Sequence, residues 1–277
     1  MSDRRLNRAR CSQNERVRVG HIEIDQRAVS RLCYAGAWAL GAPMLALDGE
    51  NVRFANRALC GILGYADPRE LLGRDVGSVV RGLMGAVSSL NVGGGSEVQP
   101  AHRVSAKLLR KQGGSRQESA YVASIEADGT WLTLLVFYAA QTSEPKHSLT
   151  AEREIGPKDP ELGRAILEAL PSPVLIQDVD TILFANAAAR SYVGASKGTK
   201  LEGAPIASIV HPDGLDAMFE RVRFVFEAQH RLQGVPVKLR TPDGRSLHVV
   251  ADAYPVESDG LRAALIVATS VSEGKSD

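Results

Sequence analysis

The second half of the chain begins with a helical pattern that gives way to two strand-like runs. Residues 159–170 place apolar side chains on one helical face, with Asp159 as the expected N-cap and Pro160 in the first turn. Two short runs, "PVLIQD" and "TILFA", follow this helix and are rich in residues that favour strands. The runs meet at residues 178–180, which predicts a β-hairpin.

A longer helix is predicted after the loop "HPDG" at residues 211–214, and Gly234 is expected to end it. Its apolar positions recur at helical spacing: Leu215, Met218, Phe219, Val222, Val225 and Phe226. Three strand-like runs, "VPVKLR", "SLHVVADAYPV" and "LRAALIVATSV", close this half, and a "TPDG" turn joins the first two. Strands at both ends with helices between them indicate an antiparallel sheet with helices on one face, an α+β domain.

The first half of the chain repeats this pattern. Phe-Ala-Asn occurs at residues 54–56 and again at residues 184–186, and the two asparagines are 186 − 56 = 130 residues apart. The same offset relates further identical pairs: Pro43 with Pro173, Asp48 with Asp178, Ala58 with Ala188, Leu71 with Leu201, Gly73 with Gly203, Val80 with Val210, Arg110 with Arg240, and Gly114 with Gly244. Two copies of one domain explain a register that holds across most of each half.

The repeated Phe-Ala-Asn run is interpreted as a structural corner. Phe54 and Phe184 end a strand inside the core, and the next residues begin an amphipathic helix. Asn56 and Asn186 are predicted to cap these helices, because an asparagine side chain can accept from the first free backbone N–H groups.

Composition and charge narrow the class of protein. With 277 residues, 44% of them hydrophobic, the chain can bury two cores, and its net charge of +1 argues against a broad nucleic-acid-binding face. The three cysteines, Cys11, Cys33 and Cys60, form no CxxC spacing, which favours a reduced, cytoplasmic setting. The longest apolar run, residues 35–47, is too short and too broken to span a bilayer, so no membrane association is expected. Residues 1–25 are basic and are expected to form a flexible tail.

Taken together, these motifs resemble the PAS sensory domain family. The matching residues are "RFAN", "ILGY" and "ELLG" in the first copy, and "ALPSPVLIQD", "LFANAAA", "HPDG", "TPDGR" and the terminal "IVATSVSEGK" in the second. The resemblance implies two PAS-like domains, each a five-stranded antiparallel sheet with helices that can enclose a ligand cavity. We place these domains, with their preceding helices, at residues 26–142 and 159–272, joined by a linker at residues 143–158 and followed by a tail at residues 273–277.

The first copy departs from the family pattern in its middle. Residues 87–102 contain three consecutive glycines where the second copy has its long helix, so a short or irregular helix is expected there.

The last strand of the first copy, residues 131–138, is apolar on both faces. An antiparallel strand with one solvated face should alternate with polar residues, so we expect a second layer to cover the outer face. That layer is either the helix expected at residues 26–40 or the same surface of a second chain, and we favour a homodimer. The candidate interface residues are Val29, Leu32, Trp131, Leu132, Leu134, Val136 and Tyr138.

The long helix of the second copy is the candidate wall of a small-molecule pocket. A filled core is the more common role of an apolar helical face, and it stays the alternative. The pocket candidates are Met218, Val222, Val225 and Phe226, with His248 or Tyr254 as polar contacts.

No cofactor is predicted, and haem and flavin are the alternatives. The resemblance implies that a haem-binding PAS domain would use a proximal histidine, for which His230 and His211 are the outside candidates. Flavin photochemistry would need a cysteine in a polar helix motif, and Cys60 does not stand in one. No Cys/His spacing suits a metal, and no nucleophile–base pair or acid pair emerges, so we expect no enzyme.

The sequence therefore predicts a cytoplasmic signal-sensing regulator that acts through tandem PAS domains, without an output domain of its own. It is expected to bind a protein partner, such as a kinase or a transcription regulator, and to accommodate a small ligand. One alternative is a ligand-free dimeric scaffold or co-regulator. Another is the sensor portion of a histidine kinase or transcription factor whose effector is absent here.

Overall fold

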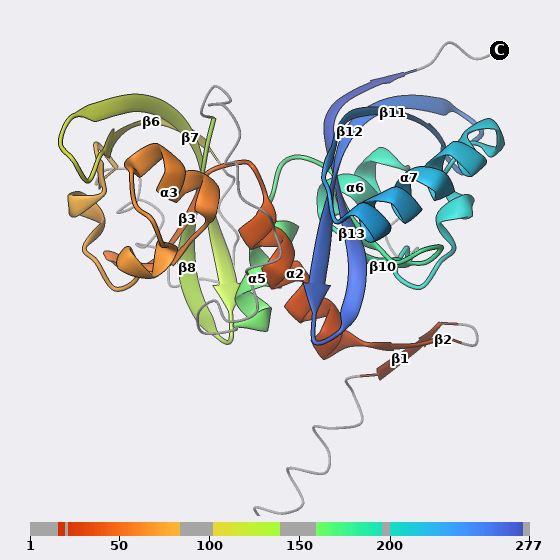
Figure 1. The fold of residues 1–277 in the computed structure, drawn as a ribbon, viewed down its shortest axis with the longest axis horizontal. Coiled ribbons are helices and arrows are strands. Elements are labelled where there is room, and N and C mark those ends of the chain that lie inside the picture. The colour runs from red at the N-terminus through yellow and green to blue at the C-terminus, as the bar shows by residue number, and fades with distance from the viewer. Residues whose placement is uncertain (1–15, 20–21, 84–101, 139–158, 196–199, 274–277) are drawn as a thin grey trace, which may run out of the picture. The chain divides into compact units, whose positions relative to one another are not determined.

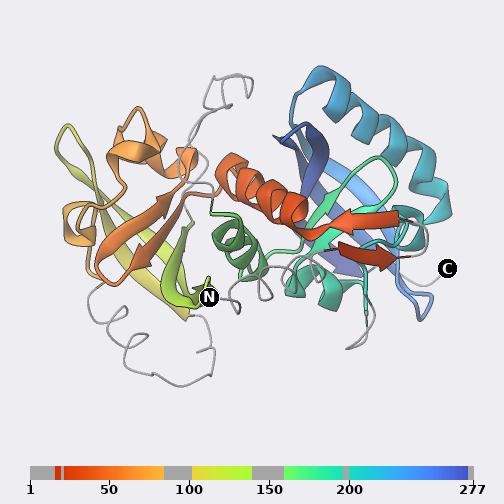
Figure 2. The same cartoon turned by 90° about the horizontal axis from the view of Figure 1, so that it is seen from below.

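Two compact units make up the chain, one formed by Ala37–Ile166 and the other by Met1–Gly36 together with Leu167–Asp277. We call them the first and the second domain. The computed structural model describes residues 16–19, 22–83, 102–138, 159–195 and 200–273 (Figures 1 and 2). The expected linker at residues 143–158 and all but the last residue of the glycine-rich stretch at 87–102 lie outside the described residues.

In the first domain, antiparallel strands form one sheet in the order β4-β3-β8-β7-β6-β5. The strands are β3 (Met44–Asp48), β4 (Asn51–Ala55), β5 (Val80–Arg81), β6 (His102–Leu109), β7 (Ser115–Ala127) and β8 (Thr130–Phe137), with helix α3 (Arg57–Leu63) after β4. The expectation of five strands is wrong here, because the two-residue strand β5 pairs with β6 through Val80 and Leu108 and adds a sixth.

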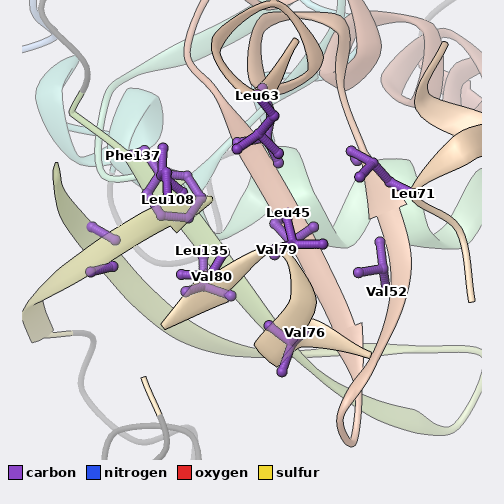
Figure 3. Packing of buried hydrophobic residues seen from close by; sticks show 14 of the residues in the cluster. Leu45, Val52, Leu63, Leu71, Val76, Val79, Val80, Leu108, Leu135 and Phe137 are labelled. Carbon is purple, nitrogen blue, oxygen red and sulfur yellow. The ribbon is translucent and has the colours of Figure 1, made fainter. Parts of the chain in front are cut away.

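The core of the first domain lies between the inner face of the sheet and the segment from α3 to β5. Leu63, Leu108 and Phe137 belong to this cluster, and each is at most 2% exposed (Figure 3). Strand β8 supplies Leu135 and Phe137 to this cluster. The residues on its opposite face are also buried: Leu132, Leu134 and Val136. The sequence was therefore right to predict a strand that is apolar on both faces.

The second domain repeats the architecture with five antiparallel strands in the order β10-β9-β13-β12-β11. Its elements are β9 (Val174–Gln177), β10 (Ile182–Ala185), helix α6 (Ala187–Tyr192), helix α7 (Leu215–Ala228), β11 (Leu232–Arg240), β12 (Ser246–Ser258) and β13 (Leu261–Glu273). Two α+β domains with antiparallel sheets confirm the predicted fold class.

The long helix of the second domain ends earlier than the sequence predicted. Helix α7 ends at Ala228, and Gln229 follows it in the left-handed conformation with φ 51°. Gly234, the expected terminator, lies within β11 with φ 63°, where the pairing with β12 shifts register between Leu232 and Val235. Gly234 therefore permits a β-bulge, which glycine favours because it adopts positive φ without a Cβ clash.

Two helices precede the sheets along the chain. Helix α2 spans Gln26–Ala39, and helix α5 spans Pro160–Glu168 after Asp159, whose Oδ1 accepts from Leu162 N at 3.1 Å. Within the expected flexible tail, strands β1 (Arg16–Val19) and β2 (Ile22–Asp25) pair with each other. Among the described residues, no helix combines the length and the apolar character needed to cross a membrane.

Helix α2 contacts the second domain through its residues up to Gly36. A Cβ on Gly36 would lie 3.3 Å from Leu265 Cδ1, so the helix backbone approaches β13 closely. The Arg31 guanidinium lies 2.6 Å from an Asp259 carboxylate oxygen at the β12–β13 turn. The outer face of the second sheet is thus contacted by the helix that the sequence offered as cover for the first sheet.

Asn56 occupies the corner between β4 and α3 and is fully buried. Its Oδ1 accepts from Leu59 N at 3.1 Å, as an N-cap, and from Met44 N at 3.0 Å. Its amide Nδ2 reaches three carbonyl oxygens near the end of α2: Ala37 at 3.5 Å, Leu40 at 3.1 Å and Ala42 at 2.7 Å. Asn56 therefore caps one helix and fixes the end of another.

Candidate ligand cavity in the second domain

A cavity of about 100 Å³ lies beneath α7 in the second domain. The apolar lining comes from β9, α6, α7, strands β11, β12 and β13, the segment 206–210 and residues that flank these elements. Its members are Pro173, Leu175, Ala189, Val193, Ile206, Ile209, Val210, Met218, Val222, Val225, Leu232, Val235, Val237, Leu239, Val249, Ala251, Ala253, Ile266 and Ala268. Three polar side chains complete the lining: Gln177, Tyr192 and Arg221. Such a space accepts a small, mainly apolar molecule.

The cavity exists because the second domain has small side chains where the first has large ones. Phe137 N donates to Pro43 O at 2.9 Å, and Ala268 N donates to Pro173 O at 3.0 Å, so Phe137 and Ala268 are structural equivalents. The Phe137 ring is part of the buried core of the first domain. Ala268 has only a methyl group at the equivalent position, and this methyl group lines the cavity. Protein interiors are otherwise close-packed, so a missing phenyl ring leaves room.

Helix α6 contributes to the same difference in packing. The Asn56 cap accepts from Leu59 N and the Asn186 cap accepts from Ala189 N, which makes Leu59 and Ala189 equivalent. Leu59 is fully buried in the first core, and Ala189 lines the cavity in the second. Replacing a leucine by an alanine in a packed interior opens space unless neighbouring residues collapse into it.

Gln177 is a polar side chain inside the second domain, 2% exposed. Its Nε2 lies 3.7 Å from the thioether Sδ of Met218, which is a weak acceptor. With the offset of 130 residues, 177 − 130 = 47, the first domain has Leu47 at this position, within its buried core. An amide donor has therefore taken the place of an apolar side chain in the domain that contains the cavity.

Arg221 stands at the rim of the cavity, on the face of α7 that also carries Met218 and Val225. Its Nη1 donates to Pro236 O on strand β11 at 2.9 Å, so the side chain bridges the helix and the edge strand. Leu232 and Val235 on this strand are only partly buried, although they line the cavity. The cavity consequently approaches the surface between α7 and β11.

Asn186 forms the corner between β10 and α6, next to the cavity. Its Oδ1 accepts from Val174 N at 2.9 Å and from Ala189 N at 2.8 Å. Its amide Nδ2 reaches three carbonyl oxygens at the end of α5 and just beyond: Leu167 at 3.1 Å, Leu170 at 3.2 Å and Ser172 at 2.9 Å. The corner thus joins α5, the first strand of the sheet and a helix that lines the cavity.

Comparison with models of known protein families assigns both domains. A model described as the PAS fold matches residues 161–269, and a model described as a PAS domain matches residues 39–91. The chain belongs to the PAS sensory domain family. A tandem of PAS domains gives the chain a sensory or signalling role.

Solved PAS domains are similar to parts of the chain at low sequence identity. The PAS domain of an HTR-like protein from Haloarcula marismortui is 17% identical, and the match covers 37% of this chain and 90% of that one with a TM-score of 0.32. A PAS domain of a two-component sensor histidine kinase is 9% identical, and the match covers 39% of this chain and 92% of that one with a TM-score of 0.32. A PAS domain from Colwellia psychrerythraea is 17% identical, and the match covers 36% of this chain and 86% of that one with a TM-score of 0.32. The comparison with curated proteins found no match.

The pocket residues proposed from the sequence divide into two groups. Met218, Val222 and Val225 line the cavity of the second PAS domain. Phe226, His248 and Tyr254 are not part of the lining. Phe226 packs against neighbouring apolar clusters, His248 is exposed, and Tyr254 is buried elsewhere in the domain.

The cavity of the second PAS domain offers no histidine in its lining that could ligate haem. His211 caps a short helical turn through Asp213 N, and His230 is exposed with its Nδ1 beside Ala228 O, so neither lines the cavity. Within the part of the chain that the structure describes, no cluster of three or more His, Cys, Asp or Glu residues could hold a metal ion.

Most of the interface residues proposed from the sequence are buried within the single chain. These are Val29, Leu32, Leu132, Leu134 and Val136, with at most 6% exposed. Trp131 is 45% exposed and Tyr138 is 43% exposed, with the Arg103 guanidinium 4.7 Å from the Tyr138 ring. A second chain could therefore contact these two aromatic side chains without rearrangement, and the homodimer stays a prediction.

Three features of the site escaped the sequence reasoning: Gln177, Arg221 and the small residues Ala189 and Ala268. A signal for the small residues was present in the repeat. Aligning the two PAS domains position by position pairs Ala189 with Leu59, and this shows a loss of side-chain volume in the second copy.

Proposed function

We propose that the chain is a signalling protein whose second PAS domain senses a small, mainly apolar molecule. The observation that carries this proposal is the cavity beneath α7, which has formed where the first PAS domain has larger side chains at equivalent positions. An apolar cavity of this size would lower stability if nothing occupied it, because its lining side chains forgo contacts that a filled core provides. A bound ligand restores those contacts.

The response to the ligand travels through Asn186 to helix α5. Pro173 and Ala189 both line the cavity, and both are tied to Asn186. Ala189 N donates to Asn186 Oδ1, and the neighbours of Pro173 on both sides, Ser172 and Val174, hydrogen-bond to Asn186. A ligand that shifts α6 or the start of β9 moves the Asn186 side chain. This changes its hydrogen bonds to the Leu167 and Leu170 carbonyl groups at the end of α5. Ligand binding can change the equilibrium between two such arrangements by as much as its affinities for them differ.

The recipient of the signal is a protein partner, such as a kinase or a transcription regulator, or a second copy of the chain. Trp131 and Tyr138 support a docking role, because large aromatic side chains that remain exposed in a monomer are frequent anchors at interfaces. A scaffold that needs no ligand would use the same surface and leave the cavity empty. Ligand binding therefore distinguishes the two functions.

Methionine methyl NMR tests the proposal with a control inside the same chain. Met218 lines the cavity, whereas Met44 is fully buried in the first PAS domain. We expect titration with hexan-1-ol, an uncharged apolar probe, to shift the Met218 methyl signal to saturation and to leave the Met44 signal in place. The two signals are assigned with the variants Met218→Leu and Met44→Leu.

The variant Ala268→Phe, which carries the residue found at the equivalent Phe137, is expected to abolish the Met218 response while the domain stays folded. An unmoved Met218 signal in the unaltered chain at about 10 mM probe, which corresponds to binding weaker than about −2.7 kcal/mol, would contradict a ligand-sensing cavity.

A further inference from the structure

We propose that the ligand of the second PAS domain is a monocarboxylate with a short apolar body, and that Arg221 binds its carboxylate group. This inference rests on the proposed function, because it names the chemical class of molecule that enters the same cavity. It is carried by the charge and the remaining hydrogen-bond donors of Arg221, at the rim of an otherwise apolar cavity.

Arg221 has donors to spare at the cavity rim. A guanidinium group carries five N–H donors, and Nη1 of Arg221 makes one hydrogen bond, to Pro236 O. Within the described residues, no carboxylate oxygen lies within 4 Å of this guanidinium. Arg223, which lies two residues further along α7, does not line the cavity. Its Nε lies 3.9 Å from a carboxylate oxygen of Glu227.

A cation beside an apolar cavity favours an anionic ligand. Arg221 is half-buried, with apolar walls on its cavity side, so an ion pair there is partly shielded from solvent and gains strength from the lower local dielectric constant. No Asp or Glu lines the cavity among the residues that the structure describes, whereas all three polar lining side chains, Gln177, Tyr192 and Arg221, can donate a hydrogen bond. An anion held at the rim by Arg221 would therefore meet no opposing carboxylate from the lining.

Charge and size point to a carboxylate on a small body. One arginine balances one negative charge, and the planar guanidinium matches a carboxylate with two parallel hydrogen bonds. An engineered cavity of about 150 Å³ binds benzene, so a cavity of about 100 Å³ holds an apolar body of about four carbon atoms. With its carboxylate and the adjoining CH₂ group at the rim beside Arg221, hexanoate has these dimensions.

The test compares three probes that share a six-carbon chain: hexanoate, hexan-1-ol and hexylammonium. Each is titrated into the full chain at about pH 7, and the Met218 methyl signal reports binding. We expect hexanoate to bind about fivefold more tightly than hexan-1-ol, because a half-buried ion pair with Arg221 adds to the contacts that the two probes share. Hexylammonium is expected to bind more weakly than the alcohol.

Variants of the two arginines on α7 complete the test. Arg221→Leu should remove the preference for hexanoate while hexan-1-ol still binds, which shows that the cavity remains. Arg221→Lys should keep most of the preference, because the charge is retained, and Arg223→Leu should leave it unchanged.

The outcomes separate this inference from the proposed function. Equal affinities for hexanoate and hexan-1-ol, or a preference for hexanoate that survives in Arg221→Leu, would overturn the carboxylate site and leave a sensor of neutral molecules. If no probe moves the Met218 signal, the inference and the ligand-sensing function both fail.

Discussion

Asn56 and Asn186 make the same side-chain hydrogen bonds in the two PAS domains, at positions 186 − 56 = 130 residues apart. Each side-chain oxygen accepts from the N-terminal residue of the first strand and from the third residue after the asparagine. Each amide group reaches the carbonyl oxygens of residues 19, 16 and 14 positions earlier. One buried asparagine per domain thus joins the preceding helix, the sheet and the following helix.

Replacing either asparagine by alanine should destabilise its own domain by roughly 2–4 kcal/mol, because a helix cap is lost and buried N–H and C=O groups lose their partner. Thermal unfolding of Asn56→Ala and Asn186→Ala checks this, and the two losses should be similar. The variants Asn56→Asp and Asn186→Asp separate the two roles. A carboxylate can still cap but cannot donate to carbonyl groups, so an Asp variant as stable as the wild type would mean that capping alone matters.

Filling the cavity should remove ligand binding without unfolding the domain. Ala189→Leu introduces the residue that the first PAS domain has at Leu59, and we expect probe affinity to fall more than tenfold while stability changes by less than about 1.5 kcal/mol. The control is Ala187→Leu on the same helix, where the side chain is exposed and binding should be unchanged. Unaltered probe affinity in Ala189→Leu would place the ligand elsewhere.

The reverse change tests whether the core of the first PAS domain is filled. Leu59 is fully buried within its cluster, so Leu59→Ala should cost about 2–5 kcal/mol in the free energy of unfolding. Chemical denaturation measures this cost. A loss below about 1 kcal/mol would show that this position is not closely packed.

Gly36 should tolerate alanine but not leucine. An alanine Cβ would meet two methyl carbons of Leu265 at 3.3 and 3.4 Å, which a small side-chain shift relieves, whereas a leucine would force α2 away from β13. Hydrogen exchange of the α2 amides should speed up in Gly36→Leu and stay near the wild-type rate in Gly36→Ala. The matched control is Gly61→Leu in α3, because nothing lies within 4 Å of a Cβ built there. Equal exchange in Gly36→Leu and in the wild type would show that α2 does not need this contact.

The Cys60 thiol should be unreactive in the native protein. Burial, with smaller contributions from Asp67 and Glu70, raises its pKa from 9.0 to about 12, so almost no reactive thiolate is present at neutral pH. Iodoacetamide at about pH 8 should modify Cys60 only after unfolding, as peptide mass spectrometry can show. Modification at the rate of a free thiol in the folded chain would contradict this burial.

The same shift in pKa gives a stability effect with a definite sign. Because the folded-state pKa is raised, the contribution of Cys60 is fully present below about pH 9 and is lost as pH rises toward 12. Between about pH 9 and pH 12, the free energy of unfolding should therefore decline less steeply with pH in Cys60→Ala than in the wild type. Parallel curves would show that Cys60 does not contribute to the alkaline decline.

The architecture could be predicted because its signals are local and occur twice. The Phe-Ala-Asn run marks a strand end and a helix cap within a few residues, and the repeat fixes the domain count. The end of α7 could not be read in this way. Gln229 adopts a left-handed conformation, which a glutamine does not predict. Gly234, the expected helix terminator, instead lies at a bulge in β11.

The site was predicted in part. Helical periodicity identifies the face of α7 that carries Met218, Val222 and Val225, but it does not show whether the opposing residues fill the space. That depends on residues far away in sequence, such as Ala268 on β13. Arg221 looks like an ordinary surface charge on a helix until the position of β11 is known.

Xenon binding tests the central claim most directly, because xenon occupies apolar cavities without needing a specific chemical group. In crystals of the chain held under xenon pressure, we predict xenon density between Met218, Val225 and Ala268 in the second PAS domain, and none beside Leu59 and Phe137 in the first. An empty second domain, or equal xenon occupancy at the equivalent positions of both domains, would contradict the account.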